Sequence, residues 1–445
     1  MKSKIAGVFG LRLAYSALTF LISILLARIL GKAGFGVYTY SIVWAYLLSV
    51  PATMGFDNFV VKQVAIYQTQ SSWHSMRGLL NCANRTVVVA SILVSFLAIL
   101  IASFFRGDAL SETFAGFCLA MLLMPALSLR NIRRGAMRGL NNVARGLLPE
   151  LLFDPLILIA LTVGAYFVLG DALTPLWVIG FYGVGSGITL LVVSRFLKQT
   201  LPDDFFKAKP TYETWPWLKT AVPFMLLESV PIINSQVDVL MLGSYKGSAA
   251  VGLYVPVNRG AQLIAFILMA VGSSLTPVIA SGFASGKMAE LQKTITSSVR
   301  IVAGVGFLFA ATLVVFNSFY LGLFGPEFLA GRNALYIFCA GNFVATSMGL
   351  SYAALNMTGL EREAATIGWG ATIFNVVLNA VLIPIWGVNG AALATSIGSA
   401  TGSFVGLITV RKKLGLDMTI FGWLGESFPK GDVLHADEKL VQGKI

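Results

Sequence analysis

Residues Leu218–Ala280 read LKTAVPFMLLESVPIINSQVDVLMLGSYKGSAAVGLYVPVNRGAQLIAFILMAVGSSLTPVIA, two apolar runs separated by the short break Lys246–Ala249. Each run is longer than the about 20 residues that a helix needs to cross a bilayer. The runs nevertheless contain three ionisable residues, Glu228, Asp238 and Arg259. Because a charge in the bilayer interior is costly unless it is paired or faces water, these residues indicate a polar site inside a membrane protein.

The same stretch contains one copy of an internal repeat. It includes AVGLYVPV at Ala250–Val257, and the chain reads GFGVYTYS 216 positions earlier, at Gly34–Ser41. In both places an apolar run ends, a short loop with glycine follows, and a Gly-X-Tyr begins the next run. Because internal repeats in transporters fold alike, we expect two similar membrane bundles with a polar cavity between them.

The composition is that of a membrane protein with many spans. Of the 445 residues, 56% are hydrophobic and only 12% are charged, against about 25% charged in a soluble domain. The three cysteines stand far apart in or near apolar runs, which excludes a disulfide framework, and two histidines are too few for a histidine metal centre. These residues are Cys82, Cys118, Cys339, His74 and His435.

Apolar runs of about 18 or more residues predict twelve transmembrane helices. The predicted spans are 9–29, 37–63, 84–105, 113–131, 147–169, 174–197, 218–243, 250–279, 299–324, 331–357, 364–386 and 390–411. We therefore expect an all-α integral membrane protein with about 12 transmembrane helices in two six-helix lobes, arranged as parallel repeats. The expected division is an N-terminal lobe at 1–197, a cytosolic linker at 198–217, a C-terminal lobe at 218–411 and a cytosolic tail at 412–445.

Basic residues are distributed unevenly about these spans. If the breaks after odd-numbered spans face the outside, five of the 32 basic residues lie there: Arg28, Lys32, Arg106, Lys246 and Arg332. Since cytoplasmic loops are enriched in lysine and arginine, we expect both ends of the chain in the cytosol. The net charge of +12 then reflects topology and contact with anionic lipids, and nucleic-acid binding is not expected. One cytosolic loop is expected to hold Arg130, Arg133, Arg134, Arg138 and Arg145.

A first group of ionisable residues is expected near the cytosolic end of the N-terminal lobe: Arg12, Asp57, Arg85, Glu150 and Asp154. Glu150 and Asp154 are four positions apart and share a helix face, where two carboxylates repel each other unless a cation lies beside them. Candidates for that cation are Arg12, Arg85, a proton or a metal ion. The guanidinium groups of Arg12 and Arg85 are also suited to bidentate binding of a phosphate. The alternative is that the arginines extend to the interface and pair with the acids structurally.

The second group, Glu228, Asp238 and Arg259, lies on spans seven and eight. At the rise of an α-helix, Asp238 lies about 8 Å and Arg259 about 12 Å below the break between these spans. Two interpretations stay open. Asp238 and Arg259 form a structural ion pair between the helices, or Arg259 attracts an anionic headgroup in the cavity while Asp238 serves a coupling ion.

A third group is uncharged and lies on spans eleven and twelve. Asn375 and Asn379 are four positions apart, and Thr395 follows on the next span. Amides and hydroxyls in an apolar bundle either hold helices together by hydrogen bonds or supply oxygen ligands to a cation such as Na⁺. The sequence alone leaves both roles open.

Sequence signatures of enzymes are missing. The chain has no Walker loop, no GxSxG and no HExxH, so neither an ATP site of that kind nor those hydrolytic centres is expected. A membrane glycosyl polymerase or ligase usually carries a sizeable outer loop with polar groups, and no predicted outer loop here is long enough to fold as a domain. We therefore expect a transporter and not an enzyme.

Four motifs resemble those of bacterial oligosaccharide flippases, over roughly residues 5–412. In order they are LLARILGKAGFGVYTYSIVWAYLLSVPATMGFDNFVVKQVA, DVLMLGSYKGSAAVGLYVPVNR, MGLSYAALNMTGLER and NVVLNAVLIPIWGVNGAALATSIG. The chain is thereby identified as similar to the multidrug/oligosaccharidyl-lipid/polysaccharide (MOP) exporter superfamily, which includes the lipid II flippase and MATE-type multidrug antiporters. The resemblance implies two six-helix lobes that form a V around a central cavity.

The resemblance also implies roles for the three groups. Flippases of this superfamily use cavity arginines for the pyrophosphate, which supports Arg12, Arg85 and Arg259 as substrate-binding residues. Candidates for ion coupling are Asp57, Glu150, Asp154, Glu228, Asp238, Asn375, Asn379 and Thr395. The lipid II branch has a sodium site whose layout Asp238, Asn375, Asn379 and Thr395 match. Since Asn379 stands where that pattern has a second acid, Na⁺ and H⁺ both stay open as the coupling ion, and no other cofactor is expected.

The implied function is to move an undecaprenyl-pyrophosphate-linked oligosaccharide from the cytosolic to the outer leaflet by ion-coupled alternating access. The product would serve a cell-surface polysaccharide, such as the O-antigen of lipopolysaccharide. The implied location is the bacterial cytoplasmic (inner) membrane, and the implied partners are the lipid-linked substrate, membrane lipids, and polysaccharide polymerase and ligase enzymes. The main alternative is a MATE-type multidrug/cation antiporter, which predicts a cavity dominated by acids and aromatic residues.

Overall fold

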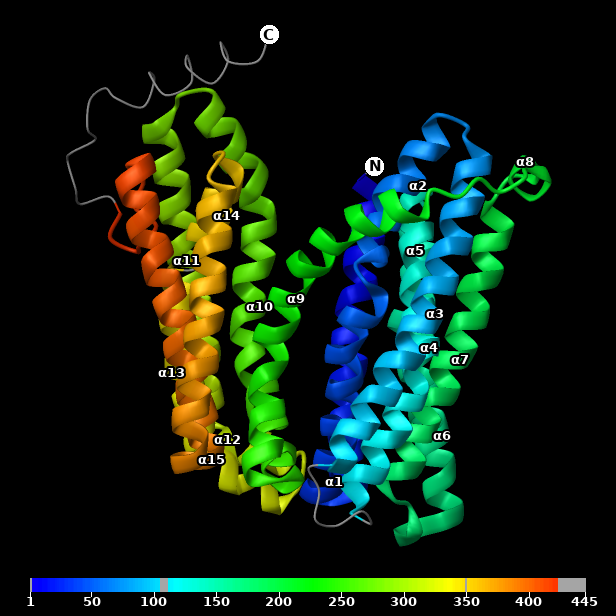
Figure 1. Cartoon of the computed structure of the whole chain (residues 1–445). Coiled ribbons are helices and arrows are strands. Elements are labelled where there is room, and N and C mark those ends of the chain that lie inside the picture. Colours follow the sequence, from blue (N-terminus) through cyan, green and yellow to red (C-terminus); the bar gives the residue numbers. More distant parts are fainter. Residues whose placement is uncertain (1, 105–110, 349, 423–445) are drawn as a thin grey trace. The chain divides into compact units, whose positions relative to one another are not determined.

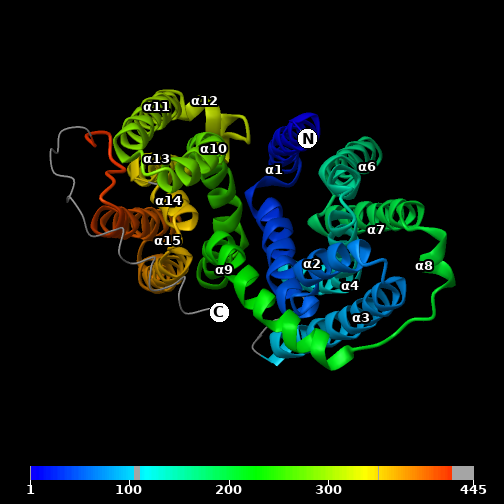
Figure 2. The same ribbon diagram turned by 90° about the horizontal axis from the view of Figure 1, so that it is seen from above.

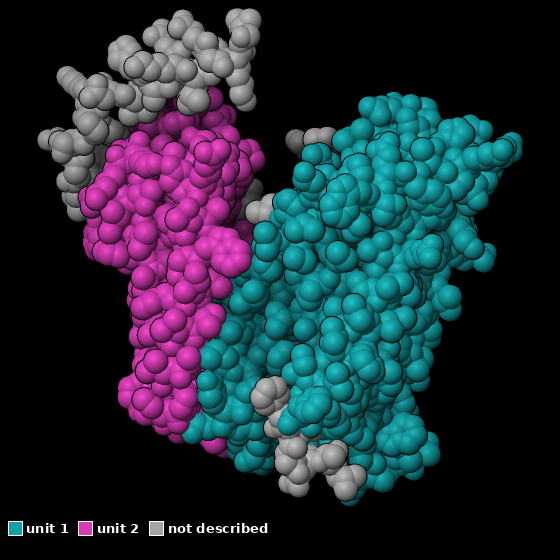
Figure 3. Space-filling model, in the orientation of Figure 1, with its two compact units in different colours: residues 1–253, 323–328 teal, residues 254–322, 329–445 magenta. Residues whose placement is uncertain are grey.

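The computed structural model describes residues 2–104, 111–348 and 350–422, and the described residues are helical with short connections and no strand. Figure 1 shows the helices in chain order. Two compact units divide the chain: unit 1 is Met1–Leu253 with Leu323–Phe328, and unit 2 is Tyr254–Gly322 with Leu329–Ile445 (Figure 3). The units are described one by one.

The all-α membrane fold predicted from the sequence is confirmed. Within the described ranges, eight helices are long and apolar enough to cross a membrane, or nine if the bent helix α9 (Thr214–Lys246) is one span. Helix α15 (Glu361–Leu414) holds two predicted spans and α10 (Ser248–Ala284) holds one. Helix α1 (Lys2–Thr53) holds the first predicted span and most of the second, which continues into α2 (Phe56–Thr69). Within the described ranges, each of the twelve predicted spans is therefore largely helical, and some of them extend over two successive helices.

Two glycines explain why pairs of predicted spans run on as one helix. Gly31 in α1 has φ 64° and ψ 177°, and Gly387 in α15 has φ 55° and ψ −125°. Glycine adopts such positive φ values without the steric cost of a Cβ. The chain thus bends sharply at one residue where the sequence analysis placed a loop of several residues.

Helix α4 (Glu112–Gly139) is the centre of unit 1. It contacts α1, α2 (Phe56–Thr69), α3 (Trp73–Phe104) and α7 (Pro175–Thr200), which surround it in the view of Figure 2. The helix α9 also belongs to unit 1, where it contacts α1, α2 and α3. The predicted lobes follow the sequence repeat, whereas these units follow packing, so the predicted lobe boundaries stay a prediction.

Between α4 and α7 the chain forms α5 (Val143–Leu148), the π-helical turn η1 (Pro149–Phe153), α6 (Asp154–Leu169) and the 3₁₀ turn η2 (Gly170–Ala172). Prolines at 149 and 155 lack the amide hydrogen that an α-helix uses. In η1 the amide of Asp154 donates to the carbonyl of Pro149, five residues back, which is the π-helical pattern. This turn carries Glu150 into the site described below.

The predicted linker at 198–217 is fastened to unit 1. After α7 it forms the short helix α8 (Asp203–Lys207). Arg77 of α3 donates to the carbonyl oxygens of Phe206 and Ala208, at 2.6 and 2.8 Å. The amide of Thr211 donates to the carbonyl oxygen of His74 at 3.2 Å. The residues that join α8 to α9 therefore lie against the end of α3.

Unit 2 contains most of α10, then α11 (Met288–Val315), α12 (Asn317–Gly322), the second half of η3 (Pro326–Gly331), α13 (Arg332–Met348), α14 (Ser351–Met357) and α15. The helix α13 packs against α11 and α15, and α14 also packs against α15. At the interface of α13 and α15, Gly341 lies directly against the side chain of Ser396, and such small residues let membrane helices approach closely.

The beginning of the predicted cytosolic tail is part of unit 2. Leu416 and Met418 are fully buried, and Gln292 of α11 exchanges two hydrogen bonds with the backbone of Asp417, at 2.7 and 2.8 Å. Arg300 donates to the carbonyl oxygen of Ile420 at 3.0 Å. The rest of the predicted tail, from residue 423 on, lies outside the described residues.

Candidate functional site

The arginines expected in a cytosolic loop lie on helices. Helix α4 continues to Gly139, so it carries Arg130, Arg133, Arg134 and Arg138, and Arg145 lies on α5. Arg130 is only 2% exposed. The loop prediction was wrong because hydropathy ends the apolar run where the arginines begin. The acids that neutralise two of them come from another part of the chain.

Arg130 and Asp154 form an ion pair in the interior of unit 1. A terminal nitrogen of Arg130, Nη1, donates to Oδ2 of Asp154, and the hydroxyl of Thr189 donates to Oδ1 of the same carboxylate. The hydroxyl of Ser186 lies 3.4 Å from Arg130 Nη1. Asp154 is 7% exposed. Both oxygens of this buried carboxylate are thus hydrogen-bonded, and its charge is compensated by a guanidinium.

Glu150 lies between two arginines. Its Oε2 accepts a hydrogen bond from Nη1 of Arg134, and its Oε1 is 4.0 Å from Nη2 of Arg130. The pattern of the sequence explains the pairing, because Arg130 and Arg134 are four positions apart on α4, and Glu150 and Asp154 are four positions apart on the segment that these ion pairs join to it.

This pairing corrects the expected partners of the two acids. Arg12 on α1 and Arg85 on α3 are exposed, and the cations that contact Glu150 and Asp154 are Arg134 and Arg130. The sequence pattern that indicates these ion pairs is two basic residues and two acidic residues with the same spacing of four positions.

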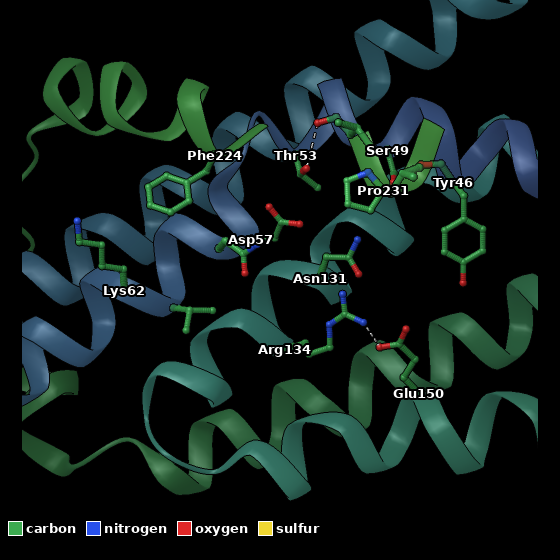
Figure 4. A pocket seen from close by; sticks show the side chains of 14 residues that line it. Tyr46, Ser49, Thr53, Asp57, Lys62, Asn131, Arg134, Glu150, Phe224 and Pro231 are labelled. Carbon is green, nitrogen blue, oxygen red and sulfur yellow. Dashed lines mark hydrogen bonds and ion pairs between the residues drawn. The ribbon is translucent and has the colours of Figure 1, made fainter. Parts of the chain in front are cut away.

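Arg134 and Glu150 line a cavity of about 760 Å³ in unit 1, shown in Figure 4. Its walls come from α1, α2, α4, η1 and α9. The polar lining consists of Tyr46, Ser49, Thr53, Asp57, Asn58, Lys62, Asn131, Arg134 and Glu150. The apolar lining consists of Val50, Val61, Phe224, Pro231 and Ile232. Cavities of about 300–1,000 Å³ hold small molecules and headgroups, and polar groups of this kind fix their orientation.

Asp57 lies in the first turn of α2, directly after a sharp break in the chain. Met54 and Gly55 have φ values of 51° and 76°, and there the chain passes from α1 to α2. The backbone carbonyl of Asp57 lies so close to Gly135 of α4 that a Cβ at Gly135 would collide with it. The side-chain oxygen Oδ1 of Asp57 is buried and has no hydrogen-bond partner among the described residues. Its carboxylate therefore retains binding capacity beside the cavity.

Other predicted site residues lie elsewhere. Arg12 and Arg85 are not among the described residues that line this cavity. Asp238 is 3% exposed on α9 in unit 1, and Arg259 lies on α10 in unit 2. The side chain of Glu228 lies outside the described part of the chain. The pairing expected between Asp238 and Arg259 stays a prediction.

Asn375, Asn379 and Thr395 lie together within α15, on both sides of its bend. Nδ2 of Asn379 donates to the carbonyl and side-chain oxygens of Asn375, at 3.0 and 3.1 Å. Nδ2 of Asn375 lies 3.4 Å from the hydroxyl of Thr395. These three residues belong to unit 2 and Asp238 belongs to unit 1, so the four-residue sodium site stays a prediction.

Solved structures with a similar chain path define the class of the fold. An inward-facing multidrug resistance MATE family transporter of the MOP superfamily aligns with a TM-score of 0.75 and 13% identity, over 90% of this chain and 94% of that one. The lipid II flippase MurJ in an inward closed conformation aligns with a TM-score of 0.70 and 15% identity, over 92% and 88%. The protein therefore has the fold of MOP-superfamily membrane transporters.

The sequence places the chain more narrowly within that class. A family model described as polysaccharide biosynthesis protein matches residues 5–283, and the chain belongs to this family. The MatE model matches residues 232–382. Two relatives from Haloferax volcanii align over most of both chains. The probable low-salt glycan biosynthesis flippase Agl15 is 24% identical, over 90% of this chain and 80% of its own, and the probable flippase AglR is 25% identical, over 91% and 82%.

Proposed function

We propose that the protein is a flippase that moves a lipid-linked oligosaccharide across the membrane. Membership of the polysaccharide biosynthesis family and the flippases among its relatives support this function. The observation that carries it is the unit 1 cavity, in which the cations Arg134 and Lys62 lie beside amides and hydroxyls. Cations suit a pyrophosphate, and amides and hydroxyls suit sugar hydroxyl groups.

The proposed substrate is an undecaprenyl-pyrophosphate-linked oligosaccharide, carried from the cytosolic to the outer leaflet of the cytoplasmic membrane. Both ends of the chain then lie in the cytosol, and the delivered lipid serves polysaccharide polymerase and ligase enzymes. The headgroup enters the polar cavity while the polyprenyl tail stays in lipid, because transfer of the charged headgroup through hydrocarbon is costly. The basic residues Arg12, Arg85 and Arg259 remain candidates for further contacts with the substrate.

Transport against a gradient needs a source of energy, and we propose an ion gradient. In unit 1 the candidate for ion coupling is Asp57, whose Oδ1 has no hydrogen-bond partner in the described ranges. Glu150 and Asp154 are compensated by arginines, which makes them weaker candidates. The second proposed site is the sodium site of Asp238, Asn375, Asn379 and Thr395, and Glu228 stays a candidate with them.

The function is tested with purified protein in sealed liposomes that contain a lipid-pyrophosphate oligosaccharide. We expect the sugar to appear on the opposite leaflet under an imposed Na⁺ or H⁺ gradient, and to remain in place with the Arg134→Gln variant. Movement of the lipid at the same rate with and without the protein would contradict a flippase.

A MATE-type drug antiporter is the second candidate, and one observation favours it. The MatE family model matches residues 232–382, which include the second half of α9 and much of unit 2. Under this function the same liposomes would exchange an organic cation such as ethidium for Na⁺ or H⁺. Cation transport without movement of the lipid-linked sugar would decide for the antiporter.

A further inference from the structure

We propose that Glu150 is a built-in competitor of the substrate's phosphate groups. It binds Arg134 while the cavity is empty and passes to Arg130 when an anionic headgroup takes Arg134. This inference rests on the proposed function and adds a positioning residue to it, since Glu150 acts on the substrate through Arg134.

The ion network contains one sealed pair and one open pair. The side chains of Arg130 and Asp154 are 3% and 9% exposed, and neither lines the cavity. The side chains of Arg134 and Glu150 are 25% and 16% exposed, and both line it. Figure 4 shows the guanidinium of Arg134 at the cavity wall, with Glu150 on its far side from Asp57. A ligand in the cavity can therefore reach Arg134 without disturbing the sealed pair.

Arg130 can receive the displaced carboxylate. Its Nη2 is already 4.0 Å from Oε1 of Glu150, and its Nε is buried without a hydrogen-bond acceptor in the described part of the chain. Breaking an ion pair in a protein interior is costly mainly because one charge is left uncompensated. Here Glu150 keeps a guanidinium within reach when Arg134 turns to the ligand, so the exchange avoids that cost.

This arrangement gives the cavity a chemical preference. A carboxylate with one negative charge occupies Arg134, and only a ligand that binds a guanidinium at least as well displaces it. A pyrophosphate has several oxygens for bidentate contact with arginine and more negative charge than a carboxylate. Neutral sugars and organic cations gain nothing from Arg134 and leave the pair closed. Lys62 and Asp57 line the same cavity. Lys62 attracts an anionic ligand and Asp57 repels it, whichever arginine Glu150 contacts.

The exchange also favours release of the substrate. If Arg134 had no partner in the empty state, it would hold the phosphate until an outside ion replaced it. With Glu150 tethered beside it, the returning carboxylate competes for the guanidinium at a high effective concentration. Removing the carboxylate should therefore strengthen binding and slow transport together.

The test compares binding and transport in Glu150→Gln, Glu150→Ala, Glu150→Asp and Arg134→Gln. The binding probe is inorganic pyrophosphate, with farnesyl pyrophosphate as a lipid-linked second probe, titrated onto protein in nanodiscs. We expect both Glu150→Gln and Glu150→Ala to bind each probe about threefold to tenfold more tightly, which corresponds to about 0.7–1.4 kcal/mol. Their transport in liposomes should fall, and Glu150→Asp should restore both values toward those of the unaltered protein.

Glu290→Gln is the matched control, because Glu290 at the start of α11 forms an exposed ion pair with Lys287 at 3.7 Å and does not line the cavity. It should change neither affinity nor transport. If Arg134→Gln abolishes pyrophosphate binding while both neutral Glu150 variants bind no more tightly than the unaltered protein, the competitor role is wrong and the proposed function stands. If pyrophosphate does not bind and Arg134→Gln transports lipid-linked sugar normally, the cavity assignment fails as well.

Discussion

Gly36 of α1 and Gly252 of α10 lie directly against each other's chain segment within unit 1. A Cβ on Gly36 would collide with the carbonyl of Ser248 and lie 2.9 Å from the amide nitrogen of Gly252. A Cβ on Gly252 would collide with the carbonyl of Lys32 and lie 3.2 Å from the amide nitrogen of Gly36. The two glycines occupy equivalent positions in the two copies of the sequence repeat, 216 positions apart. The repeated glycine thus lies where the backbones of α1 and α10 are in direct contact.

Replacing either glycine by alanine should destabilise the protein. Because the nearest atoms are backbone atoms that cannot rotate away, Gly36→Ala and Gly252→Ala should each lower the free energy of unfolding by about 1–3 kcal/mol. The melting temperature of detergent-solubilised protein, followed by size-exclusion chromatography, measures this effect. Gly180→Ala and Gly187→Ala are matched controls, since a Cβ at either position would meet no atom within 4 Å beyond the adjacent backbone of its own helix. Equal melting temperatures for all four variants would contradict a close contact.

The membrane fold could be predicted from the sequence because its signal is strong at every span. Twelve apolar runs and the 216-residue repeat indicate an all-helical transporter without any tertiary information. The sharp bends at Gly31 and Gly387 could not be predicted, because an apolar run does not show whether a glycine between two runs adopts a positive φ. The π-helical turn at Pro149–Phe153 likewise follows from local hydrogen bonding that hydropathy does not report.

The candidate site could be predicted only in part. Asp57, Glu150 and Asp154 stand out in the sequence as acids in an apolar context, and two of them line the cavity. Their surroundings do not reveal Arg130 and Arg134 as helical residues, because positive charge at the end of a span is also the signal of cytosolic topology. Only the ion pairs that join α4 to η1 and α6 distinguish a buried counter-ion from a topological charge.

Removing one partner of the sealed ion pair should be more harmful than removing both. Asp154→Asn leaves the buried Arg130 without its closest carboxylate and should cost about 3–5 kcal/mol of stability. The double variant Arg130→Met with Asp154→Leu removes both charges and should recover at least half of that loss. Thermal unfolding of the three proteins in one detergent tests this. A double variant that is no more stable than Asp154→Asn would show that the charges contribute more than mutual neutralisation.

Asp57→Asn should separate transport from stability. The Oδ1 atom of Asp57 has no hydrogen-bond partner within the described ranges, so an amide there should change the free energy of unfolding by less than about 0.5 kcal/mol. If Asp57 carries the coupling ion, substrate movement in liposomes should no longer respond to the imposed gradient. Asp203→Asn, at an exposed position on α8, is the control and should keep a full response. A normal gradient response in Asp57→Asn would assign coupling to another carboxylate.

Arg77 should determine whether the linker stays attached to α3. Its guanidinium donates to two carbonyl oxygens, those of Phe206 and Ala208. A hydrogen bond to a charged group contributes about 1.5–3 kcal/mol to stability. Arg77→Ala should therefore release the segment locally and expose the bond after Lys207 to trypsin, whereas the bond after Lys209 precedes Pro210 and is not a trypsin site. We expect cleavage after Lys207 to accelerate about tenfold, while overall melting shifts little because α3 and α9 keep their own packing. Lys62→Ala, which also removes a basic side chain from unit 1 but no contact to the linker, should leave the cleavage rate unchanged. Equal rates for Arg77→Ala and the unaltered protein would mean that the amide of Thr211 and the ring of His74 hold the segment without Arg77.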